Sequence, residues 1–316
     1  MEAVHTPVLL EETVQYLAPR GNGELMLDAT VGEGGHSLAF LSRFPDLKIV
    51  AIDADPLIQK TARERFGEFG DRVCFYSGWA QSFFASYPGD LGRPDTILMD
   101  LGISMFHYEK SGRGFSFRKD EPLDMRLDTA SGPDAADLVA TLSEKDLADL
   151  IYRNAGERYS RRIAKAIVAA RKQGKIRNSG ALAELVAAAV PPSYRHGPVH
   201  PATKTFQALR IAVNGELSRL PDLLEGGFGV LKAGGRMGVI SFHSLEDRIV
   251  KNFFREKSRD CTRSPEAPIG RGKGCRFVNI LTRKGLVPGE AEKQKNPPSR
   301  SARLRVIEKL LEEDGK

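Results

Sequence analysis

The chain has 316 residues, 41% of them hydrophobic, which is enough for one large core or two smaller ones and argues against disorder. Because no run of about 18 apolar residues occurs and the N-terminus lacks the pattern of a signal peptide, we expect a cytoplasmic protein without membrane segments. Cys74, Cys261 and Cys275 form no C-x-x-C pair, so we expect reduced thiols and no bound metal.

The positive charge is concentrated near the C-terminus. The formal net charge is +6, yet residues 251–309 hold 16 basic and six acidic side chains, a net of +10, which leaves 31 − 35 = −4 for the remaining residues. Such a basic segment predicts a polyanionic partner. Several of its cations lie among glycines or follow an Asn-Pro-Pro turn, and we expect at least some to project from flexible backbone and contact phosphate groups. These are Arg271, Lys273, Arg276, Arg300, Arg303 and Arg305.

Short apolar segments alternate with helical patterns in the first hundred residues, which predicts a parallel sheet covered on both faces. A helix is expected over 37–44, and another begins where Asp55 is placed to cap it and Pro56 occupies the first turn. The expected strands are 24–28, 48–52, 72–76 and 95–99, and carboxylates end the first, second and fourth of them: Asp28, Asp53 and Asp100.

The pattern changes after Asp100. Helical spacing dominates, with one helix beginning at Ser143 and a capping-box spacing to Asp146, and no strand pattern is evident between about 106 and 200. Further helices are expected over 159–172 and 181–190, and strands over 236–242, 277–281 and 304–307. We therefore predict an α/β domain formed by residues 1–105 and 206–316, interrupted by an inserted helical domain, residues 106–205, that recognises the substrate.

The first predicted strand meets a glycine-rich turn, Asp28-x-Thr30-x-Gly32-x-Gly34-Gly35, which lets backbone amides approach a ligand at a helix N-terminus. Asp53, at the end of the next strand, is placed to accept both hydroxyls of an adenosine ribose. Together they predict a nucleoside cofactor. An NAD-dependent oxidoreductase is the alternative, but Ser37 stands where its third glycine is usual, and Asp28 suits a cationic sulfonium better than a pyrophosphate. S-adenosylmethionine is therefore favoured.

Asp100 ends the fourth strand, where open α/β sheets hold the reacting part of a ligand. Its carboxylate could accept hydrogen bonds from the weakly nucleophilic amine of cytosine or adenine and stabilise charge during methyl transfer, while a helix cap is the alternative role. His243 is a second catalytic candidate. The segment around it lacks the G-x-S-x-G elbow of a hydrolase, and Ser244 with Asp247 is expected to form a capping box.

Eight segments in the same order resemble the bacterial RsmH (MraW) family of methyltransferases. That resemblance implies a class I, Rossmann-like methyltransferase fold with an inserted helical domain and S-adenosylmethionine as cofactor. It also implies methylation of N4 of a cytidine in the decoding region of small-subunit (16S) ribosomal RNA. We expect this RNA within the small ribosomal subunit, with free RNA as the alternative, and a homodimer is left open. The segments are residues 5–10, 32–37, 51–56, 100–104, 113–117, 122–126, 200–210 and 240–248.

The resemblance also implies site residues. Gly34, Gly35 and His36 would line the methionine and adenosine part of the cofactor, Asp53 the ribose, and Asp100 the junction of cofactor and target base.

One position departs from the family pattern, and the choice of the residue that covers the adenine stays open. His107 stands where the family usually has a cofactor-contacting Gln, and either Trp79 or Phe83 is expected to cover the adenine. A ribosome-binding assembly factor that has lost activity is a further alternative, against which Asp28, Asp53 and Asp100 argue.

Overall fold

The computed structural model describes residues 6–259 and 277–310, which form two compact units. The first contains the described residues up to Gly102 and from Arg219 onward, and the second spans Ile103–Ser218. The expected boundary at 206 falls inside α11 (Thr203–Asn214), whose residues all belong to the second unit, and the two units divide at 218/219. Among the described residues, no helix is long and apolar enough to span a membrane.

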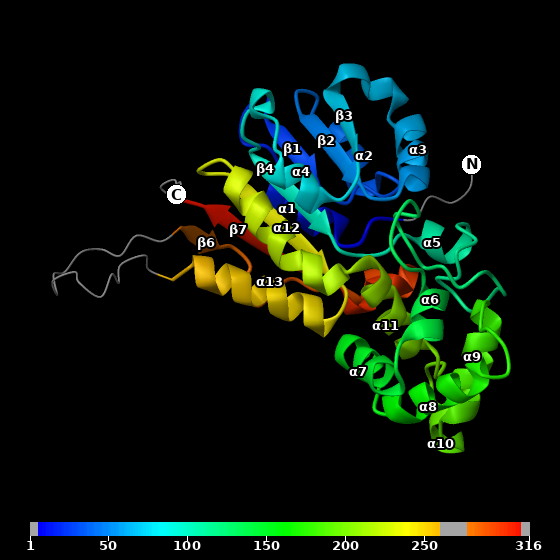
Figure 1. Cartoon of the computed structure of the whole chain (residues 1–316). Coiled ribbons are helices and arrows are strands. Elements are labelled where there is room, and N and C mark those ends of the chain that lie inside the picture. The colour runs from blue at the N-terminus through cyan, green and yellow to red at the C-terminus, as the bar shows by residue number, and fades with distance from the viewer. Residues whose placement is uncertain (1–5, 260–276, 311–316) are drawn as a thin grey trace. The chain divides into compact units, whose positions relative to one another are not determined.

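The first unit is a sheet that, in the described residues, has seven strands in the order β3-β2-β1-β4-β5-β7-β6 (Figure 1). Strands β1 to β5 run parallel, whereas β7 is antiparallel to both β5 and β6. The prediction of an α/β sheet interrupted by helices is confirmed. The strands are β1 Leu25–Asp28, β2 Lys48–Asp53, β3 Val73–Ser77, β4 Thr96–Asp100, β5 Arg236–Ser241, β6 Val278–Ile280 and β7 Arg303–Lys309.

Alternating side chains of the central strands enter two cores, one on each face of the sheet. Leu27 and Met99 pack with α4, α12 and α13, whereas Met26 and Leu98 pack with α1, α2 and α3 (Figure 1). The helices are α1 Leu10–Leu17, α2 Gly35–Arg43, α3 Pro56–Arg65, α4 Ala80–Ala85, α12 Glu216–Val230, α13 Ser244–Lys257 and α14 Glu290–Lys295. Short 3₁₀ turns occupy Gly67–Arg72, Gly89–Leu91 and Pro297–Ser301.

The second unit is helical, as predicted, and its described residues carry a separate core in which Leu147, Ile163 and Leu182 are fully buried. The predicted cap at Ser143 is confirmed, because its hydroxyl accepts a hydrogen bond from the Asp146 amide. The helices are α5 Met105–Glu109, α6 Ala135–Thr141, α7 Glu144–Ala155, α8 Ser160–Arg171, α9 Ser179–Ala189, α10 Pro192–Arg195 and α11 Thr203–Asn214.

Candidate active site at the carboxyl edge of the sheet

Acidic side chains end three neighbouring strands of the first unit. Asp28 ends β1, Asp53 ends β2 and Asp100 ends β4, and the order β2-β1-β4 brings them to one edge of the sheet. The parallel direction of these strands is the reason, since their carboxyl ends share an edge. This is the arrangement that the sequence predicts.

The glycine-rich turn after β1 is held against β2 by Asp53. One oxygen of Asp53 accepts a hydrogen bond from the Gly32 amide at 2.9 Å, and the other accepts from the Asp55 amide at 2.8 Å. Asp55 in turn caps α3, as predicted, by accepting from the Leu57 amide. Asp53 therefore fixes the turn against the end of β2.

Gly34 and Gly35 are required by the shape of this turn. Gly34 has φ +83° at the N-cap of α2, and a Cβ there would lie 2.4 Å from the Phe66 ring. A Cβ on Gly35 would lie 2.6 Å from Pro7. A side chain at Gly34 would strain the backbone and displace Phe66, and one at Gly35 would displace Pro7, so the turn keeps this shape only with glycines.

Asp28 lies beneath the turn and connects β1 to α2. It is 2% exposed, and its Oδ2 accepts a hydrogen bond from the Ser37 hydroxyl at 2.6 Å. Burial raises the pKa of Asp28 to about 6, against the lowering effect of its hydrogen bonds from Ser37 and Thr30. A buried carboxyl of this kind is stabilised as an anion by a nearby cation, which fits the charge of the predicted cofactor.

Asp100 and His36 face one another at the same edge. The Val8 carbonyl lies 3.0 Å from His36 Nε2; since a carbonyl only accepts, Nε2 carries the hydrogen and Nδ1 presents a lone pair. That Nδ1 is 3.7 Å from Asp100 Oδ2, while Asp100 Oδ1 accepts from the Gly102 amide. Burial lowers the pKa of His36 to about 4 and raises the pKa of Asp100 to about 7. A neutral imidazole therefore adjoins a carboxyl that titrates near physiological pH.

The raised pKa of Asp100 predicts the direction in which pH changes the free energy of unfolding. Between its ordinary pKa of 3.8 and about 7, the folded state holds the proton more tightly than the unfolded chain, so this group makes the free energy of unfolding fall as pH rises through that interval. Asp100→Asn retains an acceptor for Gly102 but carries no charge. We expect it to raise the free energy of unfolding of the cofactor-free protein by about 2 kcal/mol at pH 8, and by much less at pH 4.

Urea unfolding at the two pH values measures this difference. Equal effects of the substitution at both pH values, or destabilisation at pH 8, would contradict the assignment of a costly, partly buried charge to Asp100.

The aromatic candidates Trp79 and Phe83 differ in their surroundings. Phe83 is 4% exposed and packs in the core against Tyr76, whose ring centroid is 4.8 Å away. Trp79 is the N-cap of α4 and follows Gly78, whose amide donates to the carbonyl of Asp53. The location beside Asp53 therefore favours Trp79 over Phe83 as the residue next to a ligand.

Sequence inspection missed a partner of this tryptophan. The guanidinium of Arg219 lies 3.9 Å from the centroid of the Trp79 ring, a cation–π contact between residues 140 positions apart in the chain. No local pattern could have indicated this pair, because only the fold of the first unit brings α12 to Trp79.

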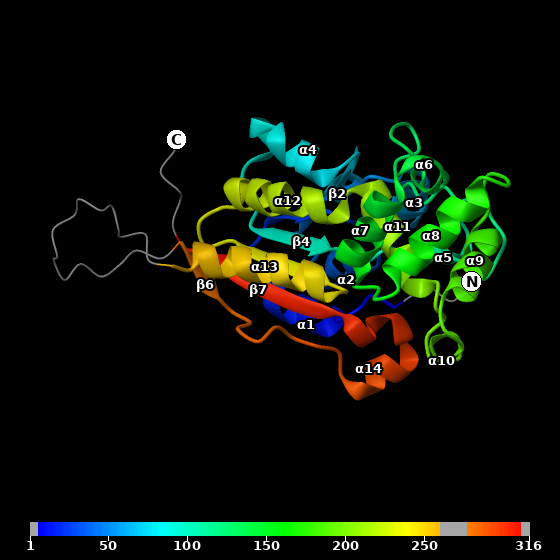
Figure 2. The ribbon, with the colours of Figure 1, turned by 60° about the horizontal axis from the view of Figure 1, so that its bottom comes forward.

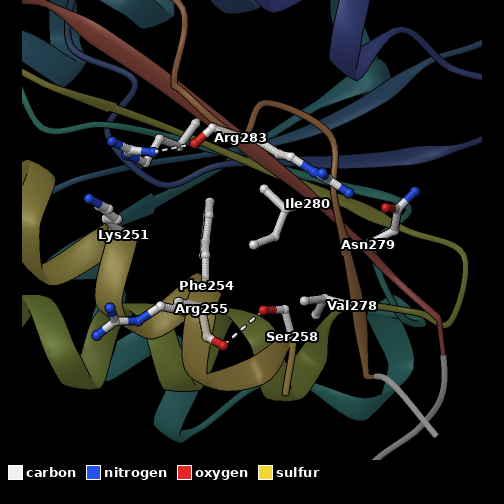
Figure 3. A pocket seen from close by; sticks show the side chains of 9 residues that line it. Lys251, Phe254, Arg255, Ser258, Val278, Asn279, Ile280 and Arg283 are labelled. Atoms are coloured by element: carbon white, nitrogen blue, oxygen red, sulfur yellow. Dashed lines mark hydrogen bonds between the residues drawn. The ribbon is translucent and has the colours of Figure 1, made fainter. Parts of the chain in front are cut away.

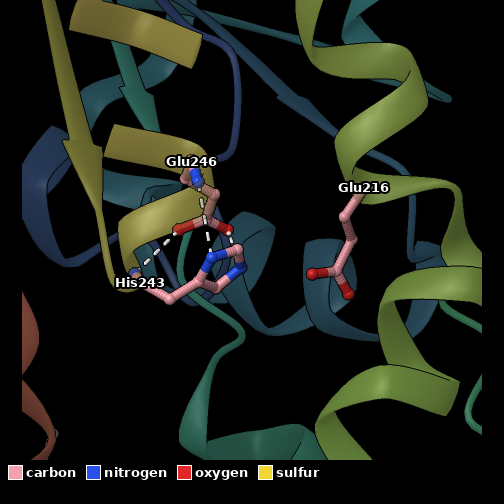
Figure 4. A group of neighbouring side chains, drawn as sticks. All are labelled: Glu216, His243 and Glu246. Carbon is pink, nitrogen blue, oxygen red and sulfur yellow. Dashed lines mark hydrogen bonds and ion pairs between the residues drawn. The ribbon is translucent and has the colours of Figure 1, made fainter. Parts of the chain in front are cut away.

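His243 is the N-cap of α13, and the predicted capping box of Ser244 and Asp247 is wrong. Ser244 is already the first helical residue, and the box is formed by His243 and Glu246 (Figure 4). Glu246 Oε2 accepts hydrogen bonds from the amides of Phe242 and His243. Figure 4 also shows the Glu246 carboxylate against the imidazole, with His243 Nε2 3.1 Å from Oε1. Glu246 is a buried residue of this edge that the sequence prediction overlooked, although its spacing from His243 was available.

Asp247 has a different role from the predicted one. Its carboxylate accepts two hydrogen bonds from Arg305 at 2.7 and 3.1 Å, and Arg303 lies 3.7 Å from the same carboxylate. These two arginines do not project from flexible backbone, since both belong to β7 and Arg305 is 6% exposed. Arg300 is exposed, as expected.

The other predicted residues lie elsewhere in the chain. His107 belongs to the helical unit, where it is buried with the rings of Phe106 and Phe115 at 5.5 and 5.2 Å. Cys74 is an exposed thiol. The remaining basic and cysteine candidates lie outside the described residues: Arg271, Lys273, Arg276, Cys261 and Cys275.

Comparison with known proteins gives a consistent set of relatives. A family model described as the MraW methylase family matches residues 2–310. A ribosomal RNA small subunit methyltransferase H from Treponema denticola is 54% identical over 310 residues, covering 98% of both chains. Proteins of the same name from Syntrophobacter fumaroxidans and Treponema pallidum are 46% and 42% identical and cover 96% of this chain, and this similarity spans 96% and 92% of their own lengths.

Proposed function

Because the chain belongs to the MraW methylase family, we propose that it is an S-adenosylmethionine-dependent methyltransferase that modifies N4 of a cytidine in the decoding region of 16S ribosomal RNA. The observation that carries the proposal is the grouping of Asp28, Asp53 and Asp100 at one sheet edge beside a glycine turn. We further propose that the RNA is presented within the small ribosomal subunit and that the enzyme acts in the cytoplasm.

The residues at the edge fit the proposed cofactor. Gly34 and Gly35 lie at the start of α2, where the methionine part of the cofactor is proposed to bind, the Asp53 carboxylate is proposed to accept from the ribose hydroxyls, and Trp79 offers a flat ring for the adenine. His36 contributes its neutral imidazole between the turn and Asp100. His107 and Phe83 remain predicted cofactor contacts, with Phe83 less favoured because of its burial.

Asp100 is the proposed catalytic residue. When bound, the cofactor supplies an electrophilic methyl group. The Asp100 carboxylate accepts a hydrogen bond from the cytosine amine, which orients the nitrogen lone pair and stabilises positive charge as the N–C bond forms. With a pKa near 7, the carboxyl is also matched to receive the proton that the amine loses. His243 stays a secondary candidate, with its capping role in α13 as the competing explanation.

The helical unit is the proposed substrate-recognition domain. Arg158, Arg161, Arg162 and Lys165 are exposed around the start of α8, and the Arg158 guanidinium lies 4.8 and 5.0 Å from the ring centroids of Tyr159 and Tyr194. Basic side chains interleaved with aromatic rings suit unpaired RNA, whose bases can stack while cations contact phosphates. The target cytidine must be unstacked for its amine to reach Asp100.

Complementation tests the function. The chain is expressed in a bacterium lacking its own methyltransferase of this family, and digested 16S RNA is analysed by mass spectrometry. We expect one cytidine in the decoding region to regain one methyl group on N4. Unchanged RNA despite expression of folded protein would exclude this activity, and methylation at another base or atom would reassign the substrate. Retention of the three aspartates supports an active enzyme over an inactive assembly factor.

A further inference from the structure

A second concave surface lies in the first unit, among α13, β6 and β7. It is a pocket of about 350 Å³ (Figure 3). Phe254, Val278 and Ile280 give it an apolar floor, and cationic side chains surround that floor; Figure 3 shows Lys251 and Arg255 on the α13 side and Arg283 beyond β6. None of these residues belongs to the edge that carries Asp100.

The cations of this pocket fall into two classes. Arg305 is neutralised by the bidentate contact with Asp247. Lys251, Arg255 and Arg283 are exposed and form no ion pair with a carboxylate of the described chain. Three uncompensated charges around a hollow attract anions more strongly than the same charges spread over a convex surface, because low-dielectric walls focus the field.

The charge continues along α13. Arg248, Lys251 and Arg255 are spaced i, i+3 and i+7, which places them on one side of the helix, and Arg248 is likewise exposed without a carboxylate partner in the described residues. Seven residues of helix span about 10 Å. Figure 2 shows α13 beside β7 and β6, with which it packs.

The row of cations formed by Arg248, Lys251 and Arg255 begins close to the proposed active site. Helix α13 starts after β5, the strand that pairs with β4, and the register places Asp100 beside Ile240. From there the helix leads away from the carboxyl edge toward the pocket. The phosphate backbone of an RNA whose target nucleotide lies at Asp100 can follow α13 from the carboxyl edge toward the pocket.

We infer that Arg248, Lys251, Arg255 and Arg283 form a binding site for the phosphate backbone of RNA flanking the target cytidine. The apolar floor and the Asn279 side chain of the pocket suit the sugar and base edge of one nucleotide. The RNA identity of the ligand rests on the proposed function, whereas its polyanionic character follows from the uncompensated charge alone. This site contacts flanking nucleotides and takes no part in methyl transfer.

The test is the salt dependence of RNA binding. The variant Lys251→Gln, Arg255→Gln, Arg283→Gln is compared with wild type for binding to a fragment of the decoding region over a range of salt concentrations. Each lost phosphate contact should flatten the slope of log affinity against log salt by about 0.7 for single-stranded RNA, so we expect a change of about 2 units. The KM for RNA should rise while kcat and S-adenosylmethionine affinity stay near wild type.

A matched control removes the same charge elsewhere. Lys48, Lys60 and Lys295 are exposed cations outside the pocket and the row, and their joint replacement by Gln should leave the slope close to wild type. If both variants flatten the slope equally, the slope depends on the net charge of the protein and not on this site, and the inference fails. If the pocket variant does not fold, the single change Arg255→Gln, with an expected change of about 0.7, and Arg255→Lys, which keeps the charge, take its place.

Other outcomes separate the alternatives. If the pocket variant keeps the wild-type slope of log affinity against log salt, the inference is overturned and the proposed methylation is unaffected. If the wild-type protein neither binds nor methylates RNA, the proposed function itself is overturned. Normal binding to naked RNA with weakened binding to the assembled subunit would assign the pocket to an acidic ribosomal protein instead. Competition by inorganic phosphate at millimolar concentration, with no effect of the variant on RNA, would indicate a small-anion site.

Discussion

Replacing Asp100 by Asn should lower the single-turnover rate of methylation by about a hundredfold or more under saturating cofactor. The amide cannot accept the amine proton, and its NH₂ group presents donors where the cytosine amine also presents donors. Asn keeps the size of the side chain and an acceptor for the Gly102 amide, so the loop after β4 should retain its shape. Rapid-quench measurement with labelled methyl groups reports the chemical step directly.

The stability experiment on the same variant is its control. A variant that is more stable at pH 8 and yet inactive separates a chemical role of Asp100 from a structural one. If turnover stays within a few-fold of wild type, Asp100 is not the catalytic group, and His243 becomes the next residue to replace.

Replacing Asp53 by Ala should weaken S-adenosylmethionine binding by about 1.5 to 3 kcal/mol, or roughly ten- to a hundredfold in Kd, the range for a lost hydrogen bond to a charged group. Part of that loss acts through the turn, because the amides of Gly32 and Asp55 lose their acceptor. Asp53→Asn keeps one carbonyl acceptor, and a smaller loss in this variant would assign the difference to the second oxygen.

Calorimetry measures both affinities. Unchanged binding by the Ala variant would remove Asp53 from the cofactor site, and comparable affinity for NADH would favour the oxidoreductase alternative.

The carboxyl edge of the sheet was predictable because its signals are local. Each of β1, β2 and β4 is a short apolar run that ends in Asp, and the glycine turn follows the first of them directly. The parallel pairing then brings the ends together without further information. The caps at Asp55 and Ser143 were equally local and were found.

The features that were missed depend on contacts distant in sequence. Arg303 and Arg305 look like part of a basic tail until β7 pairs with β5 and Asp247 comes within 2.7 Å of Arg305. His243 was expected beside a cap rather than as one, because Ser is the more usual N-cap and the extended backbone at His243 shifts the helix start by one residue.

The position of β7 has a consequence for the biosynthesis of the protein. Residues 303–309 follow β5 and β6 in the sequence and are translated after both, yet they fill the place between these two strands. The helical unit is one continuous stretch, Ile103–Ser218, and has all its core residues once that stretch has left the ribosome. The sheet unit is discontinuous, and the strand that pairs with β5 is translated only after the helical unit and β6. Its nascent β5 therefore exposes an unpaired edge until β7 has been translated, and a chain terminated before β7 would keep that edge exposed and prone to aggregation.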